Sequence, residues 1–513
     1  MTLSNPEITF NILSANEAVK NGPQQVLFVG QMLTGSATAG ELQTNIGNQN
    51  EWDTLFGKNS MLAGMIRAFR KINKVTRIDA IPLADASGDP AVSTIVFSGT
   101  ATADGTLYVT VGSYKNHRYQ LDVTTGDTAA DVAAALAAAI QADTYCPFSG
   151  ASSTVTTTIT AEHDGTEYNG ETVRVQGTVA GITFTVNAFA SGATNPTLTN
   201  IFDVVADTRY QTVVWPKSYA VANVTTSFLE DRFNANNIIL DGIALQTMVD
   251  SYADHITALN ALNQKSLVPV VVPEVTDTYW KGNAIQEFGY VLASQAAALR
   301  SLRLTEGANI TNIVTVAASP LDVEGGPALG ALPYFNTPVA NLQPIEAGKN
   351  WSAIQAEGII TAGGSVIGNN RTNTNVVLGE MVTTYKTDAA GNSDPTFKFL
   401  NNVDVATIVR EYFFNNLKDE FAQARLTEGD LIPGRSIHND RSISAFMDQL
   451  YSDLASTDYV LVQKGEAARK FFKENKTVTL DLATGKVTIN MQVPIVTQLR
   501  EIVVNMQIAF TTT

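Results

Sequence analysis

The sequence has 513 residues and a formal net charge of -16. At roughly 150 residues per domain this length predicts about three or four domains, and the acidic balance argues against nucleic acid as a partner because phosphate binding needs clustered Lys and Arg. Charged residues make up only 16% of the chain, against roughly 25% in ordinary soluble proteins. We therefore expect a surface that is neutral or buried against further copies of the chain.

Neither a membrane segment nor a cofactor site is expected. The chain has no run of about eighteen apolar residues, and residues 1–20 lack the basic start and apolar block of a signal peptide, so we expect synthesis in the cytoplasm without membrane insertion. The single cysteine, Cys146, excludes an internal disulfide. The four histidines are isolated in the sequence, so no metal site is predicted.

The chain opens with an arm that has strand character. Ile8, Phe10 and Ile12 alternate with polar residues just after Pro6. A turn then precedes a short buried strand at 25–30, a helix within 51–72 and a strand at 75–83. This strand–helix–strand order predicts the start of an α/β layer with a parallel sheet.

Residues 85–199 differ in amino-acid composition from the segments on either side. They are rich in Thr, Gly and Ala, and their basic residues are only Lys115, Arg118 and Arg174. We expect one Ala-rich helix at 129–142 and six strands, at 94–98, 106–112, 118–123, 154–160, 171–176 and 182–186. We interpret this segment as an inserted β-rich domain that faces outward and that the core fold does not require.

Regular alternation resumes with a strand at 210–215. The expected helices are 225–233, 244–262 and 284–302, and the expected strands are 238–240, 267–272 and 313–318. This order predicts a doubly wound α/β core.

A Pro- and Gly-rich passage at 320–344 leads into a final α+β domain. Its expected helices are 352–357, 404–425, 443–455 and 464–475, and its expected strands are 359–360, 364–367 and 376–385. A hairpin of strands at 477–482 and 486–493 follows, and a last alternating run reaches Phe510.

The predicted fold class is thus a multidomain α/β and α+β chain. The expected segments are an N-terminal arm at 1–20, an α/β domain at 21–84 plus 200–345, the inserted domain at 85–199, an α+β domain at 346–500 and a C-terminal strand arm at 501–513.

The two ends predict exchange of strands between neighbouring subunits, because an apolar strand with an open edge requires a partner. The expected linking positions are Ile8, Phe10 and Ile12, the hairpin residues Val487, Ile489 and Met491, and the terminal residues Ile502, Val504, Met506 and Ile508.

One basic cluster stands out in this acidic chain. Arg469, Lys470, Lys473 and Lys476 fall within the expected helix 464–475 and just after it, beside the apolar residues Ala468, Phe471 and Phe472. The apolar side would anchor the helix and leave the basic stripe facing outward. Two interpretations stay open: a solvated helix face, or a docking stripe for an acidic partner.

No constellation predicts catalysis. Gly30–Gly40 follows a strand but lacks the terminal Gly-Lys-Ser/Thr of a phosphate loop and the spacing of a dinucleotide loop. The acidic groups around Asp127 and Asp164 do not follow the ligand order of a calcium loop. Cys146 has no nearby His partner in the sequence.

Several stretches, taken together and in order, resemble Mu-like contractile phage tail sheath proteins. They are residues 22–31, 55–73, 215–216, 314–320, 357–359, 381–385 and 425–427. The resemblance covers most of the chain outside about 86–199, and its specificity comes from the ordered set.

The resemblance implies a non-enzymatic virion subunit, made in the host cytoplasm, that stacks in sixfold rings and contracts to drive an inner tube through a host envelope for genome ejection. It implies as partners further copies of the chain, the inner tail tube protein, and baseplate and tail terminator proteins. A sheath subunit of a phage-derived injection particle is a close alternative. An enzyme on the doubly wound domain and a secreted surface protein are alternatives of other classes.

Overall fold

The computed structural model describes residues 24–198, 201–205, 207–219, 225–233, 239–304, 334–431, 436–456 and 461–497. The expected N-terminal arm, the expected strand at 313–318 and the expected C-terminal strand arm lie outside these ranges. Contacts divide the chain into two compact units. One spans Pro23–Thr407 and the other begins at Ile408.

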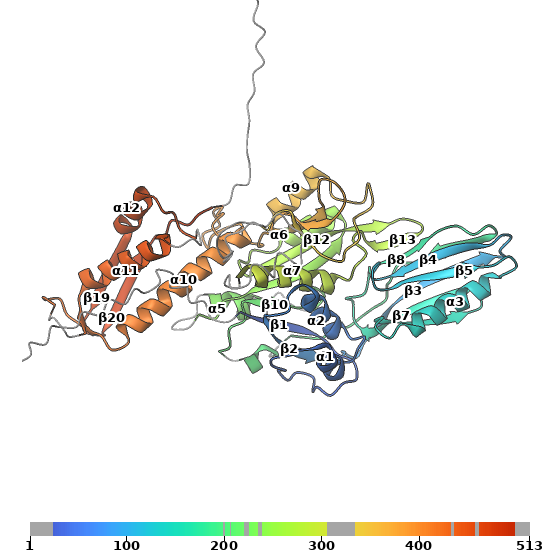
Figure 1. Cartoon of the computed structure of the whole chain (residues 1–513), viewed down its shortest axis with the longest axis horizontal. Helices are drawn as coiled ribbons and strands as arrows, with labels where there is room; N and C mark the ends of the chain where they lie inside the picture. Colours follow the sequence, from blue (N-terminus) through green and yellow to red (C-terminus); the bar gives the residue numbers. More distant parts are fainter. Residues whose placement is uncertain are drawn as a thin grey trace, which may run out of the picture. The chain divides into compact units, whose positions relative to one another are not determined.

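A parallel sheet forms the centre of the first unit (Figure 1). In spatial order its strands are β2 (Arg77–Leu83), β1 (Gln25–Gln31), β10 (Thr212–Val214), β11 (Ile243–Asp250), β12 (Leu267–Thr276) and β15 (Ser365–Asn369). Val, Ile and Leu dominate these strands and are almost fully buried. This composition is typical of parallel strands that are covered on both faces.

Helices cover both faces of this sheet. α2 (Met61–Ile72) and α7 (Gly289–Leu304) lie side by side and pack on β1, β10 and β11 (Figure 1). On β12, Val271 belongs to a separate apolar cluster with Leu259 of α6 (Tyr252–Asn260) and Ile359 of α9 (Ala353–Ala362). Because strand side chains alternate, Val271 faces away from Val270 and Val272, which pack in the main core. The mixed α/β class predicted from the sequence is confirmed.

The inserted segment builds two further sheet regions around one helix. β6 (Phe148–Ser153), β7 (Thr156–Asp164), β3 (Pro90–Gly99) and β9 (Ile182–Val186) form a four-stranded sheet in that order. α3 (Ala129–Ala142) packs against β3, β5, β6 and β7, and a capping box between Thr128 and Asp131 begins it. The helix predicted at 129–142 is confirmed.

The remaining inserted strands join the core sheet directly. β5 (Arg118–Val123) pairs with β4 (Gly105–Val111), which pairs with β8 (Val173–Gln176), which pairs with β13 (Trp280–Asn283) next to β12. The Arg174 guanidinium also lies 4.3 Å from the Trp280 ring centroid. The inserted segment therefore shares its hydrogen-bonded ladder with the α/β core, which argues against its being dispensable.

A polar seam connects β7 to the carboxyl end of β1. The buried His163 contacts Asp85 at 2.8 Å through Nδ1, and its Nε2 accepts the Met61 backbone N–H at the start of α2 at 3.1 Å. Gln31 at the end of β1 donates to Asp85 at 2.6 Å and receives a hydrogen bond from the Tyr219 hydroxyl at 3.2 Å. An inserted residue thus caps a core helix.

Short elements complete the first unit. They are α1 (Gln49–Phe56), the 3-10 turn Ile201–Val205, the π-helical turn Thr225–Glu230, α5 (Asp231–Phe233), β14 (Thr337–Pro338) and β16 (Val376–Leu378).

The second unit takes over within α10 (Leu400–Phe421). Its further elements are β17 (Arg425–Leu426), β18 (Ile437–His438), α11 (Asp440–Ser456), α12 (Glu466–Glu474), β19 (Lys476–Asp481) and β20 (Lys486–Met491). The predicted helices and the predicted hairpin of this region are confirmed, with shifted ends.

Four local expectations are wrong. Residues 239 and 240, expected in a strand at 238–240, lie outside any strand because β11 begins only at Ile243. Residues 244–250 lie in β11 instead of a helix, because they pair in parallel with β12. Ile359 and Ile360 lie inside α9 instead of a strand, because the Ser352–Gln355 capping box starts a helix that continues to Ala362. The strands β6 and β13 were not expected.

The boundary between the two compact units does not fall near residue 346, where the sequence predicts a domain boundary. The contact division falls after Thr407, because β15 adds to the core sheet beside β12. That the five segments expected from the sequence fold as separate units therefore stays a prediction.

We predict that His163→Ala lowers the free energy of unfolding by about 2–4 kcal/mol, because it removes the acceptor for the Met61 N–H and leaves Asp85 without its imidazole partner. Chemical unfolding would measure this change. Glu162→Ala, the neighbouring and half-buried position on the opposite face of β7, is the matched control. Equal stability of the two variants would contradict the capping role.

Three buried carboxyl groups near the boundary between the inserted segment and the core predict a pH dependence. Burial raises the pKa of Glu167 to about 7, that of Glu171 well above its usual range, and that of Glu287. The folded chain therefore holds protons that the unfolded chain releases above about pH 4.5, and stability should fall as pH rises from there toward 7. Thermal unfolding between pH 5 and 8 measures the slope.

Glu171→Gln should flatten this slope, since an amide resembles the protonated acid. Glu41→Gln, at an exposed position, should leave it unchanged. An unaltered slope in Glu171→Gln would show that other groups govern the pH response.

Candidate functional site

The hairpin β19–β20 is the described part of the predicted linking surface. Its register pairs Val478 with Ile489 and Leu480 with Val487, so the apolar residues share one face. The turn is closed by Asp481, whose carboxylate accepts the Ala483 N–H at 3.0 Å and the Thr484 hydroxyl at 2.6 Å. Gly485 follows with φ of 67°, a conformation that favours glycine.

The apolar face of the hairpin is only half-buried. Val487, Ile489 and Met491 alternate with exposed residues along β20. Within the described ranges β19 and β20 pair only with each other, so each strand has an open edge in that part of the chain. A short, half-covered hairpin with two open edges is a surface that can accept added strands.

The chain that follows β20 forms backbone hydrogen bonds with the segment before α12. Val462 and Ile495 form an antiparallel bridge, with Gln463 N–H donating to Pro494 O at 2.9 Å and Val496 N–H donating to Leu461 O at 3.0 Å. The last described residues therefore run along the segment that precedes α12. The linking residues Ile8, Phe10, Ile12, Ile502, Val504, Met506 and Ile508 lie outside the described residues.

α12 is anchored by one aromatic side chain. Phe472 is buried and stacks on Tyr451 at 4.5 Å and on Phe413 at 6.1 Å between ring centroids. Phe471, which the sequence also predicts as an anchor, is 43% exposed instead. Successive helix positions differ by about 100° in direction, so both rings cannot enter the same crevice.

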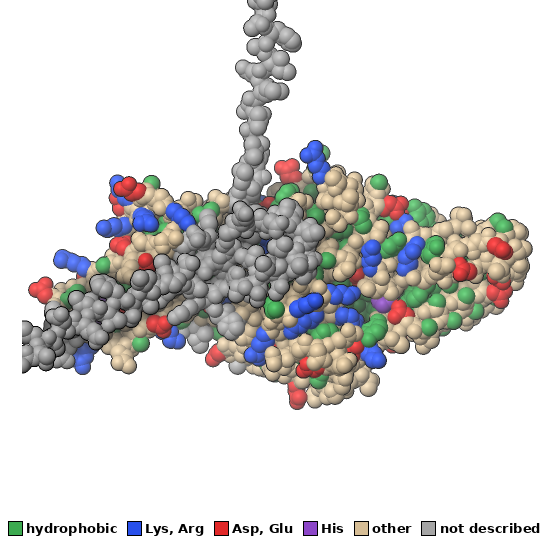
Figure 2. Space-filling view, in the orientation of Figure 1, with side chains coloured by type: hydrophobic (Ala, Val, Ile, Leu, Met, Phe, Trp, Pro, Cys, Tyr) green, Lys and Arg blue, Asp and Glu red, His purple; other side chains and the backbone are tan. Residues whose placement is uncertain are grey.

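The basic stripe on α12 is shorter than expected. Arg469, Lys470 and Lys473 are exposed, and Figure 2 shows Lys and Arg side chains gathered on the surface where Figure 1 places α12. Lys470 Nζ lies 3.7 Å from a carboxylate oxygen of Glu474, so Lys470 adds less positive potential to this surface.

Lys476 does not belong to this stripe. It begins β19, its side chain is 1% exposed, and its Nζ contacts the Asp448 carboxylate of α11 at 2.5 Å. This cation therefore fastens the hairpin to α11 and is not available to an external partner.

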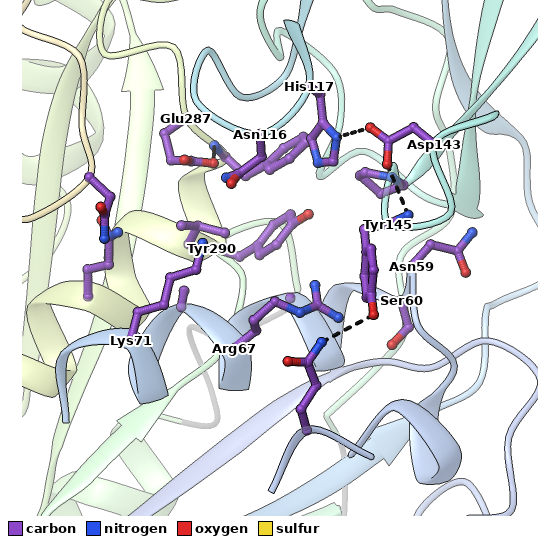
Figure 3. A pocket seen from close by; sticks show the side chains of 18 residues that line it. Asn59, Ser60, Arg67, Lys71, Asn116, His117, Asp143, Tyr145, Glu287 and Tyr290 are labelled. Carbon is purple, nitrogen blue, oxygen red and sulfur yellow. Dashed lines mark hydrogen bonds and ion pairs between the residues drawn. The ribbon is translucent and has the colours of Figure 1, made fainter. Parts of the chain in front are cut away.

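The first unit contains a cavity of about 270 Å³ between α2 and the inserted segment (Figure 3). Arg67 and Lys71 of α2, His117 and Asp143 of the inserted segment, and Glu287 lie on its wall. Arg67 is paired with Asp53 at 3.0 Å. The sequence gives no signal for this cavity, because its wall combines segments that are far apart in the chain.

Cys146 is buried behind this wall. Burial raises the pKa of its thiol to about 12, which leaves it a poor nucleophile. The sequence-based view of Cys146 as a small buried residue agrees with this environment, but its closeness to His117 and Asp143 was missed.

No helix within the described ranges has the length and apolar character needed to cross a membrane.

Comparison with known proteins confirms the resemblance found in the sequence. No protein-family model matches the chain. The chain is 23% identical over 460 residues to the Mu-like prophage FluMu tail sheath protein of Haemophilus influenzae, covering 87% of this chain and 86% of that protein.

Among solved structures, a sheath tail protein of Listeria innocua is 11% identical with a TM-score of 0.46, covering 94% of each chain. The helical sheath of the anti-feeding prophage in its contracted state is 12% identical with a TM-score of 0.43, covering 99% of each chain. These scores are too low to add to the argument.

Proposed function

We propose that this chain is the structural subunit of a contractile phage tail sheath. In this role it polymerises in sixfold rings around an inner tail tube and contracts to drive the tube through the host envelope for genome ejection. The observation that carries the proposal is the similarity to a Mu-like prophage tail sheath protein along almost the full length of both sequences.

The hairpin supports a specific mode of linkage. A neighbour's terminal strands would add to the open edges of β19 and β20 and extend the half-buried apolar face formed by Val487, Ile489 and Met491. Each backbone hydrogen bond contributes roughly 0.5–1.5 kcal/mol, and a ladder makes several of them together. Such links keep rings connected while the subunits move.

Contraction also needs parts of the subunit that move as rigid bodies. The first unit is well suited because its helices cover both faces of the parallel sheet, an arrangement that supports the proposed doubly wound core, and because the inserted segment is bonded into that sheet. Two packings of such rigid units, joined by extended arms, would give the extended and contracted states.

The exposed cations of α12 are the proposed contact with the inner tube. Arg469, Lys470 and Lys473 would face an acidic tube surface. The other proposed partners are the baseplate and the tail terminator at the ends of the sheath, and the proposed location is the virion.

The structure offers a physical reason to prefer this role over an enzyme. Enzymes on open α/β sheets bind ligands outside the carboxyl ends of the strands. At the end of β1 in this chain, Gln31, His163 and Tyr219 are buried and bonded into the polar seam. Inserted residues therefore occupy the carboxyl end of β1.

Electron microscopy of the purified full-length protein tests the proposal. Tubes or stacked rings are the expected result, and monodisperse particles that turn over a substrate would overturn it. A phage-derived injection particle is the second candidate, and it differs in that native particles would carry no DNA-filled head.

We predict that deleting residues 1–14 or 501–513 yields folded, largely monomeric protein, because the strands proposed to link subunits are removed while the first unit is intact. Analytical ultracentrifugation measures the assembly state and thermal unfolding measures the fold. Deleting only residues 511–513, beyond the alternating run, is the control and should still polymerise. Intact polymers from both long truncations would refute the strand linkage.

We predict that Arg469→Glu combined with Lys473→Glu weakens assembly around preformed tubes but spares self-assembly. The effect should be largest at low salt, where the screening length is about 30 Å at 0.01 M against about 8 Å at 0.15 M. Lys58→Glu with Lys74→Glu makes the same change in net charge at exposed positions of the first unit. Equal tube binding by both double variants at low salt would exclude docking through α12.

A further inference from the structure

We propose that His117, Asp143 and Cys146 form a binding site for a divalent transition metal ion of the zinc type. The site lies within the inserted segment and is independent of the contacts proposed for assembly. Figure 3 shows His117 and Asp143 turned toward each other at the wall of the cavity.

The fold holds the three donors on two neighbouring loops. His117 precedes β5 and is fixed by its N–H to Ser113 O at 2.8 Å, while its own carbonyl accepts the Val111 N–H at 3.0 Å. Asp143 ends α3, and the Cys146 N–H donates to the Asp143 carbonyl at 3.1 Å to close a tight turn. A metal bridging these residues would join the β4–β5 hairpin to the turn between α3 and β6.

The distances between donor atoms suit a small ion after small shifts, some of them closing and one of them opening. His117 Nδ1 lies 2.7 Å from Asp143 Oδ2, and all three donor atoms lie within 4.8 Å of one another. Metal–ligand bonds of about 2.0–2.3 Å in a tetrahedron separate ligand atoms by roughly 3.3–3.8 Å. A pair at the 4.8 Å limit would close by about 1 Å, whereas His117 Nδ1 and Asp143 Oδ2, now 2.7 Å apart, would separate by about 0.6 Å.

The donor types favour zinc over the hard cations. One imidazole, one carboxylate and one thiolate are a set that Zn²⁺ accepts, whereas Mg²⁺ and Ca²⁺ prefer oxygen alone. On binding, the Cys146 thiol releases its proton to the solvent, and the resulting thiolate sulfur coordinates the metal. A water molecule from the cavity would complete the four ligands.

Tyr119 supports the site from behind. Its hydroxyl donates to Asp143 Oδ2 at 3.2 Å. The second oxygen of Asp143 accepts the Tyr145 N–H at 3.1 Å. Outer partners of this kind orient metal ligands, and here they hold the Asp143 carboxylate in place without relying on a metal.

The cavity provides a path for the ion. It is bounded by His117 and Asp143 on one side, and its volume of about 270 Å³ exceeds the roughly 10–15 Å³ that a cavity needs to hold one water. Two cations, Arg67 and Lys71, lie on the opposite wall, and the charge of Arg67 is partly offset by its ion pair with Asp53. A hydrated ion can therefore reach the two outer donors before Cys146 engages.

Titration of metal-free, full-length protein with Co²⁺ tests the site directly. One equivalent should bind and produce the thiolate-to-cobalt charge-transfer absorption, and Zn²⁺ should displace it. Cys146→Ser should abolish that absorption, and His117→Gln should weaken binding more than about tenfold. His438→Gln, a histidine of the second unit, is the control and should behave as wild type.

Zn²⁺ should also raise the thermal midpoint of the wild type and of His438→Gln, but not that of Cys146→Ser. Absence of the charge-transfer band in the wild type would overturn the proposal even if the variants do not fold. Equal binding by the wild type and Cys146→Ser would overturn it as well, and would leave the His117–Asp143 contact as a plain hydrogen bond. Neither outcome bears on sheath assembly.

Discussion

The pairing of backbone groups along sheet edges is the constraint on which the structure depends. Unpaired N–H and C=O groups are costly when buried and adhesive when exposed. β12 meets this constraint twice, because its first part lies between parallel strands and its last residues, Glu274 to Thr276, turn to an antiparallel partner in β13. Through β13 the ladder continues into β8, β4 and β5. The hairpin of the second unit has no such continuation among the described residues.

Burial of polar groups where the inserted segment meets the core is the second constraint. Glu171 and Glu287 are almost fully buried, yet each has a donor close by: the Gly289 N–H at 3.3 Å for Glu171 and the Ser113 hydroxyl at 2.9 Å for Glu287. These bonds join inserted residues to the core, so the polar network specifies one arrangement of the two parts. The cost of burying the acids is reduced because burial favours their neutral form.

Sequence patterns predicted the elements whose periodicity is undisturbed, and failed where tertiary contacts decide. Helix 129–142 has a cap and an Ala-rich body, and the hairpin at 477–493 alternates cleanly, so both were found. β11 was mistaken for a helix because a strand buried on both faces loses its alternation. The contact between His163 and Asp85 spans 78 positions in the sequence. The burial of Lys476 depends on its ion pair with Asp448 of α11. Neither leaves a local pattern in the sequence.

The loss of Lys476 from the basic stripe bears on how the proposed sheath would work. What stays exposed on α12 is a small set of cations, one of them already paired with Glu474, and surface ion pairs contribute only about 0–1 kcal/mol each. Added strands would contribute many backbone bonds of roughly 0.5–1.5 kcal/mol. A sheath has to leave the tube during contraction while its rings stay joined. Weak, screened contacts to the tube and strong ladders between subunits meet both requirements, and the second unit carries both within residues 466–491.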